Sequence, residues 1–171
     1  MVSGLDWIEI PLKAPFFYGS YDLVLDTKKR MNVPAEVRRC IESEIHGNGL
    51  FVIVGHNKRP WLYPELYYKE IATQTPPGMM PDDNLLKYAH LKFSRAERVE
   101  WDPQGRTVMP EKILTRTETN GPVTLIGAGD HLELWPRQLW LDYEKSLEDQ
   151  SDAIEANAKI ARNTQGFQVQ Q

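Results

Sequence analysis

One short pattern occurs twice in the chain, and this repetition constrains the fold more than any other feature of the sequence. The segment Asp26-Thr-Lys-Lys-Arg30-Met-Asn-Val-Pro34 returns as Asp102-Pro-Gln-Gly-Arg106-Thr-Val-Met-Pro110, so that Asp, Arg and Pro are each displaced by 76 positions. Downstream, residues 51–55 match residues 123–127 at a displacement of 72. We interpret the two copies as a duplicated half-domain.

Two copies of a unit this long do not make a solenoid, because stacked repeats need at least three units to bury a continuous core. The duplication instead predicts a pseudo-dimer within one chain, in which two similar surfaces are related by an approximate two-fold axis. Such surfaces suit a ligand that is itself repetitive or two-fold, and duplex DNA is the obvious candidate.

The composition is that of an ordinary globular protein, with 41% apolar and 26% charged residues among 171. The sequence contains no apolar run long enough to cross a membrane, and its first residues lack the pattern of a secretory signal. The single cysteine, Cys40, fits a reducing compartment. We therefore expect a cytoplasmic protein.

The charge distribution restricts how the chain could bind nucleic acid. A net charge of -4 argues against a protein that coats DNA through bulk positive charge. Residues 26–39, however, carry five basic against two acidic side chains, whereas residues 142–162 carry six acidic against three basic ones. Any contact with DNA must therefore be local, and charge is segregated between a basic first motif and an acidic tail.

The sequence predicts five segments along the chain. They are an N-terminal arm (1–15), a first repeat (16–75), a linker and helix (76–94), a second repeat (95–143) and an acidic tail (144–171) that is helical and then disordered from Asn163.

Strands are expected at residues 18–25, 31–33, 51–54, 61–63 and 97–101, where β-branched and aromatic residues lie between turn signals. Pro34 should open a helix that runs to about Ile45, Pro64 should open another, and Asp82 should cap a third that runs to about Phe93.

In each copy of the motif a strand ends at Asp, a turn follows, and Arg comes four residues after the Asp. The Asp can accept hydrogen bonds from backbone N–H groups of the turn, so one interpretation is that Asp and Arg only brace a hairpin. Lys28, Lys29 and Arg30 together would form a compact cationic tip, which favours phosphate binding. Because the second turn has only Arg106, the two copies should not be equivalent binders.

Four segments extend the pattern into a family resemblance, which spans about residues 16–143. The segments are Phe17-Tyr-Gly19, Leu25-Asp-Thr-Lys28-Lys-Arg30-Met-Asn-Val-Pro34, Trp101-Asp-Pro-Gln-Gly105-Arg106-Thr-Val-Met-Pro110 and Glu133-Leu-Trp135. Together they resemble the MraZ family of bacterial transcriptional regulators, whose two repeats each carry an Asp-x-x-x-Arg motif followed by proline.

The resemblance implies a mainly β fold with peripheral helices, a duplicated AbrB-like swapped-hairpin β-barrel of the double-psi type with pseudo-two-fold symmetry. It also implies homo-oligomeric rings of about eight to twelve subunits, which bind direct repeats in promoter DNA upstream of the division and cell-wall gene cluster. Such a regulator would be cytoplasmic and nucleoid-associated and would need no cofactor. Carried over by position, its DNA-binding residues are Asp26, Lys28, Lys29, Arg30, Asp102 and Arg106.

The sequence departs from the family pattern at two positions near the first motif. Lys29 stands where the family usually has glycine, so the first turn must either accept a positive φ at a lysine or change its type. Tyr18 stands where relatives often have arginine, so one DNA contact could be missing, with Lys29 as a substitute.

Other candidate sites are weaker. A metal site is not expected, because the histidines lack ligand spacing; they are His46, His56, His90 and His131. The Gly127-Ala-Gly129-Asp130 segment fits a turn better than a nucleotide loop. Asp130 could pair with Asp26 or Glu133, but the sequence does not show that these carboxylates converge. The aromatic residues favour core or subunit packing over base stacking; they are Trp61, Tyr63, Tyr67, Tyr68, Trp135 and Trp140.

Two alternatives to a DNA-binding regulator stay open at this point. The first is an oligomeric protein-interaction factor that has lost its affinity for DNA. The second is an enzyme with its site inside the barrel, which would require a deep polar pocket with perturbed carboxylates or histidines. We expect the protein not to be an enzyme, because no nucleophile or metal-hydrolase motif is present.

Overall fold

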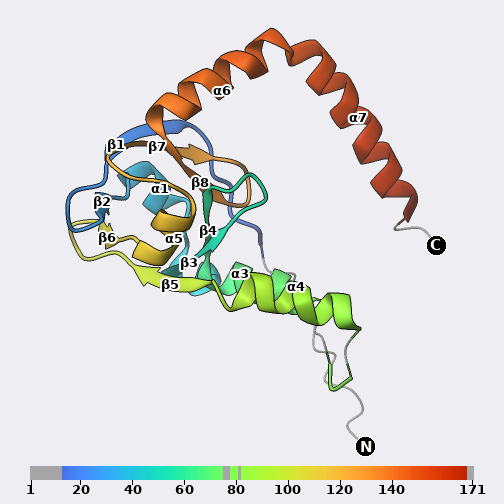
Figure 1. Cartoon of the computed structure of the whole chain (residues 1–171), viewed down its shortest axis with the longest axis horizontal. Helices are drawn as coiled ribbons and strands as arrows, with labels where there is room; N and C mark the ends of the chain where they lie inside the picture. The colour runs from blue at the N-terminus through green and yellow to red at the C-terminus, as the bar shows by residue number, and fades with distance from the viewer. Residues whose placement is uncertain (1–12, 75–77, 81, 169–171) are drawn as a thin grey trace, which may run out of the picture.

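The fold is mainly β, with helices on its periphery, in a computed structural model that describes residues 13–74, 78–80 and 82–168 (Figure 1). Six strands form one antiparallel sheet; in spatial order they are β1 (Ser20–Val24), β7 (Pro122–Gly127), β8 (Leu132–Pro136), β4 (Pro60–Pro64), β3 (Gly49–Val54) and β5 (Glu97–Glu100). Two further strands, β2 (Arg30–Asn32) and β6 (Arg106–Val108), form a separate antiparallel pair. The fold class expected from the sequence is confirmed.

The two halves of the chain exchange their first strands. Strand β1 of the first half pairs with β7 of the second, and β5 of the second half pairs with β3 of the first. Strands β2 and β6, one from each half, pair with one another and form what we call the β2–β6 ribbon. Each half therefore completes the sheet of the other, as the swapped-hairpin arrangement requires.

The strand pairing is symmetric about one pseudo-two-fold axis. Met31 pairs with Thr107, which is its own counterpart in the second copy, and Trp61 likewise pairs with its counterpart Glu133. Equivalent residues can pair with each other only where a two-fold axis passes between them. The axis therefore runs from the β2–β6 ribbon through the molecule to the β4–β8 pair.

Strands β1 and β5 form the edges of the large sheet, and each continues through a turn into the β2–β6 ribbon. An isolated bridge between Trp101 and Thr107 ties the end of β5 to β6. The ribbon thereby links the two edges into a barrel-like body. Its interior is filled by apolar side chains from both halves, among them Met31, Leu50, Leu62, Leu125 and Leu134, all at most 2% exposed.

The helix expected from Pro34 to Ile45 is instead two short helices, α1 (Ala35–Arg39) and α2 (Ser43–His46). The break lies at Glu42, whose backbone is extended and whose N–H donates to Nδ1 of His46 over 3.0 Å. His46 is buried, and its Nε2 lies 2.8 Å from the carbonyl oxygen of Lys13. A side chain that binds the backbone in this way competes with a continuous helix.

Three more helices lie beside the sheet. As expected, Pro64 precedes α3 (Glu65–Thr73), and Asp82 caps α4 (Asp83–Phe93) by accepting a hydrogen bond from the Asn84 N–H over 2.8 Å. The helix of the second copy, α5 (Glu111–Arg116), follows β6 as α1 follows β2. Residues 76, 77 and 81 of the expected linker, residue 75 at the end of the first repeat, and residues 1–12 of the expected arm lie outside the described residues.

The chain ends in two consecutive helices, α6 (Arg137–Asp149) and α7 (Ser151–Gln168), which extend away from the body (Figure 1). The expectation of disorder from Asn163 is wrong as far as Gln168, because α7 continues to that residue. Four alanines lie in α7 before Asn163, and alanine has the highest intrinsic helix propensity, so a helix formed there can continue to Gln168. Within the described residues, none of the helices is both long and apolar enough to span a membrane.

Candidate nucleic-acid interface

The first turn (residues 26–30) is organised by a single carboxylate. Asp26 Oδ1 accepts hydrogen bonds from the backbone N–H groups of Lys28 and Arg30, at 2.8 and 2.9 Å. Asp26 Oδ2 accepts from Nε of the Arg30 side chain at 2.7 Å. These hydrogen bonds from Arg30 and Lys28 lower the pKa of Asp26, which is therefore charged at neutral pH. The same carboxylate thus shapes the turn and holds the arginine.

The second turn (residues 102–106) repeats this geometry. Asp102 Oδ1 accepts from the backbone N–H groups of Gln104 and Arg106 at 3.0 and 2.9 Å, and Oδ2 accepts from Arg106 Nε at 2.9 Å. The hydrogen bonds from Arg106 lower the pKa of Asp102 as well. The bracing role expected for Asp and Arg is therefore real, but neither turn closes a simple hairpin, since the flanking strands pair with the other half of the chain.

Lys29 adopts the left-handed backbone conformation that the first turn requires. Its φ is 61°, in the left-handed region, and the matching Gly105 has a φ of 82°. The strain at a residue with a Cβ amounts to about 1 kcal/mol. The backbone carbonyl of Lys29 accepts a hydrogen bond from the Met109 N–H at 2.8 Å, and that of Gly105 accepts from the Val33 N–H at 2.7 Å. Each turn is thereby fixed to the other half of the chain.

The β2–β6 ribbon brings the two motif arginines onto one surface. Arg30 lies opposite Val108 and Asn32 lies opposite Arg106, and all four are exposed. The central pair points inward because successive residues of a strand face opposite sides. The side chains of Arg30 and Arg106 are 44% and 51% exposed, and both line one shallow hollow of about 470 Å³.

Of the three nitrogens in each guanidinium group, only Nε donates to the aspartate. Among the described residues, neither arginine's Nη1 nor Nη2 has a hydrogen-bond acceptor. A guanidinium held at Nε in this way presents its two terminal nitrogens as a paired donor, the geometry that suits a phosphate or a guanine edge. The site can therefore hold an anionic or acceptor-rich ligand at two related points.

Arg38 belongs to this surface, although the sequence motif does not include it. Its guanidinium lies over the second turn, so that a methyl group built on Gly105 would lie 2.8 Å from Arg38 Cζ. Arg38 Nε donates to the Val33 carbonyl at 3.1 Å. The second turn thus carries two guanidinium groups rather than the one that the sequence predicts. In the sequence, Arg38 is one of the five basic residues of segment 26–39, but nothing there places it at the second turn.

A second polar cluster lies at the β4–β8 end of the axis, away from the ribbon. His131 Nδ1 is 2.8 Å from Asp130 Oδ1, and His131 Nε2 is 3.2 Å from Glu133 Oε1. Burial favours the neutral form of His131, but the hydrogen bonds with Glu133 and Asp130 outweigh burial and raise its pKa. Asp130 and Glu133 therefore converge through this histidine, whereas Asp26 is bound to Arg30 instead.

Aromatic side chains surround this cluster and pack rather than form an open platform. His131 stacks on Trp61 and Tyr63, with ring centroids 4.2 and 5.0 Å apart. Trp135 stacks on Tyr143 of α6 at 4.9 Å, and Arg59 lies over the Trp135 ring. Among the described residues, no three His, Cys, Asp or Glu side chains are arranged to hold a metal ion.

Residues 127–130 form the expected turn rather than a nucleotide loop. The backbone of Gly129 exchanges two hydrogen bonds with that of Phe17, at 2.7 and 3.0 Å. A methyl group built on Gly127 would lie 2.5 Å from the Tyr18 Cα. The backbone of Phe17 and Tyr18 therefore fills the space beside this turn, where a nucleotide would have to bind.

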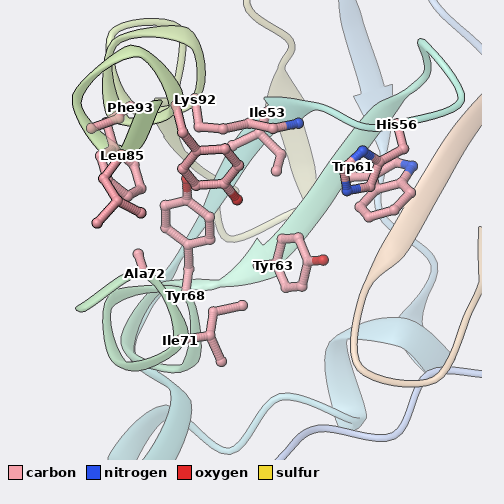
Figure 2. Close-up of a pocket in the computed structure, with 12 residues that line it drawn as sticks. Ile53, His56, Trp61, Tyr63, Tyr68, Ile71, Ala72, Leu85, Lys92 and Phe93 are labelled. Atoms are coloured by element: carbon pink, nitrogen blue, oxygen red, sulfur yellow. The ribbon is translucent and has the colours of Figure 1, made fainter. Parts of the chain in front are cut away.

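An apolar hollow of about 460 Å³ lies between α3, α4 and the sheet (Figure 2). Tyr68 and Ile71 of α3, Leu85 and Phe93 of α4, and Tyr63 of β4 point toward it. It is not the deep polar pocket that an enzyme inside the barrel would require.

Known proteins resemble this chain over most of its length. Proteins named "Transcriptional regulator MraZ" from Neisseria meningitidis and Neisseria gonorrhoeae are 29% and 28% identical to it over 140 residues, which cover 81% of this chain and 92% of each relative. A protein of the same name from Clostridium acetobutylicum is 25% identical over 144 residues, covering 84% of this chain and 98% of the relative.

A family model described as "MraZ protein, putative antitoxin-like" matches residues 92–162, the second half of the chain. The relatives extend the similarity over the first half, where the first Asp–Arg turn has the same geometry as the second. The duplicated motif, the exchanged strands and these similarities agree. The chain is similar to MraZ proteins over most of its length.

Proposed function

We propose that this protein is a transcriptional regulator that binds repeated sites in promoter DNA through the two Asp–Arg turns. The proposal draws on the printed name of the relatives, transcriptional regulator, and on the exposed surface of the β2–β6 ribbon. The observation that carries it is the meeting of Arg30 and Arg106 on one exposed face, each held by its own aspartate.

Positive charge on this face compensates for the acidic balance of the whole chain. Lys28, Lys29 and Arg30 lie on or beside the first turn, and Arg38 and Arg106 lie at the second. Phosphate contacts from such groups provide most of the affinity of a DNA-binding protein and position it on the duplex. Local basic turns are therefore sufficient for binding even though the net charge is -4.

Asp26 and Asp102 act in this proposal as positioning residues and not as DNA contacts. A carboxylate that faced a phosphate would repel it, but each of these carboxylates is already occupied by backbone N–H groups and by an arginine. Their role is to keep each guanidinium group extended toward the DNA. Because the arginine side chain is already ordered, less conformational entropy is lost on binding.

The face of one subunit is small, so high affinity requires several subunits to bind at once. We propose a ring of about eight to twelve subunits whose successive faces bind successive direct repeats upstream of a division and cell-wall gene cluster. Such a regulator acts in the cytoplasm on the nucleoid and uses neither a cofactor nor catalysis.

Titration of DNA against the full-length protein tests this function. A labelled fragment from upstream of the protein's own gene is expected to bind, and the logarithm of its binding constant is expected to fall linearly with the logarithm of the salt concentration. A scrambled fragment of equal length is the control. Equal binding to both fragments, or to neither, would remove the proposed function.

The alternative is an oligomeric protein-interaction factor that does not bind DNA. It is favoured by the apolar side chains that α4 exposes, including Leu85, Tyr88 and Leu91 at 42%, 54% and 50% exposure, and by the hollow beside them (Figure 2). The same titration separates the two functions, since this factor would form rings by native mass measurement but would leave every DNA fragment free.

A further inference from the structure

We propose that the outward face of the β2–β6 ribbon enters the major groove of DNA and that Asn32 and Val108 select the base sequence there. This inference rests on the proposed function and adds two residues outside the Asp–Arg motif. Asn32 and Val108 lie on the same exposed face as the two motif arginines.

The shape of the ribbon fits the groove. The major groove of B-form DNA is wide enough to admit a two-stranded antiparallel ribbon. In this ribbon Met31 and Thr107 point into the core and are each 2% exposed, so the outward face consists of Arg30, Asn32, Arg106 and Val108 alone. Turns with basic residues flank the ribbon and can contact the phosphates on either side of the groove.

The chemistry of the two added residues matches base edges. The Asn32 side chain makes no hydrogen bond with any described residue, so its amide keeps both a donor and an acceptor for the N6 and N7 atoms of adenine. Val108 is 58% exposed, and its branched apolar side chain suits the methyl group of thymine. Neither side chain has an evident structural task on this face.

These residues break the symmetry of the face. Arg30 and Arg106 occupy equivalent positions about the pseudo-two-fold axis, whereas Asn32 is equivalent to Val108. A face with identical residues at the two-fold-related positions would prefer a palindromic DNA sequence, because the symmetry of the protein is matched by the symmetry of its DNA site. Asparagine on one side and valine on the other favour a directional site, as head-to-tail repeats require.

The test measures base preference with a DNA fragment that the wild-type protein binds, in which each base pair is replaced in turn. We expect Asn32→Ala to lose discrimination at one A·T pair by roughly 5- to 150-fold. Val108→Ala should lose the response to one thymine-to-uracil replacement, which removes only the methyl group from the base. Neither variant should change the slope of affinity against salt, because neither side chain contacts a phosphate.

Asn84→Ala on α4 is the matched control, since it removes the same amide from an exposed helix distant from the ribbon. Thermal unfolding of each variant shows whether the fold is retained; Asn32→Ser and Val108→Ser replace any variant that unfolds. Unchanged base preference in folded variants that still bind DNA would overturn the inference and leave the proposed function standing. A wild-type protein that binds no DNA would overturn both.

Discussion

Replacing Asp26 by alanine removes a negative charge from the proposed DNA-binding face, yet we expect the variant to bind DNA more weakly. The reason is geometric. Asp26 Oδ2 holds Arg30 Nε at 2.7 Å, and Oδ1 holds the N–H groups of Lys28 and Arg30 at 2.8 and 2.9 Å. Without the carboxylate, the arginine is free to adopt other rotamers and the turn loses two of its hydrogen bonds.

Two opposing effects decide the size of the change. Ordering a free arginine side chain costs about 1.5–2 kcal/mol, which is a factor of about 10 to 30 in affinity if binding bears the whole cost. A phosphate beyond Arg30 would lie roughly 8 Å from the carboxylate, where repulsion in water amounts to a factor of about two before screening by salt. We therefore expect Asp26→Ala to bind about 5- to 15-fold more weakly.

Fluorescence anisotropy with a labelled upstream fragment measures this effect at constant salt. Asp83→Ala is the matched control, because it removes a carboxylate that pairs with Lys87 on the distant helix α4. In the double variant Asp26→Ala, Arg30→Ala the loss should lie within about twofold of that of Arg30→Ala alone, since the aspartate acts mainly through the arginine. Tighter binding by Asp26→Ala would show that repulsion dominates and would refute the positioning role.

Three further predictions concern stability. Lys29→Gly should raise the free energy of unfolding by about 0.5 kcal/mol in denaturant titrations, because relief of the positive φ of 61° slightly outweighs the added freedom of the unfolded chain; a loss of stability would contradict this. Hydrogen bonds from Arg98 and Lys69 lower the pKa of Glu65 from 4.5 to about 2, so its contribution to stability is complete above pH 4.5 and is lost as the pH falls toward 2. In the Glu65→Gln variant, the free energy of unfolding should therefore depend less on pH between 4.5 and 2. An unchanged pH dependence would refute the role of this ion pair. Leu62→Ala, at a fully buried position, should lower the free energy of unfolding by about 2–5 kcal/mol, and a loss below about 1 kcal/mol would show that the core tolerates a cavity there.

Much of the local structure could be predicted from the sequence because its causes are local. Proline fixes its own φ and lacks an N–H, so Pro34 and Pro64 mark the starts of helices. The carboxylate of Asp82 accepts from a neighbouring N–H and begins α4. The Asp–Arg spacing likewise predicts a braced turn, and both turns have that geometry.

The features that escaped prediction depend on residues distant in the sequence. The break in the helix after Arg39 depends on the buried His46 and its contact with Lys13. Arg38 joins the second turn only because strand exchange brings Gly105 beside the first helix. No period or spacing in the sequence reports such contacts, because they arise from the packing of one half against the other.

The most direct test of the central claim compares the wild-type protein with the double variant Arg30→Ala, Arg106→Ala in the same upstream-DNA titration at several salt concentrations. Both side chains are exposed, so the variant should fold and form the same oligomer. We predict that it loses nearly all affinity for the fragment and that its remaining binding depends less steeply on salt. Binding by the folded double variant that equals the wild-type affinity would contradict the claim that the β2–β6 ribbon and its turns are the DNA-binding surface.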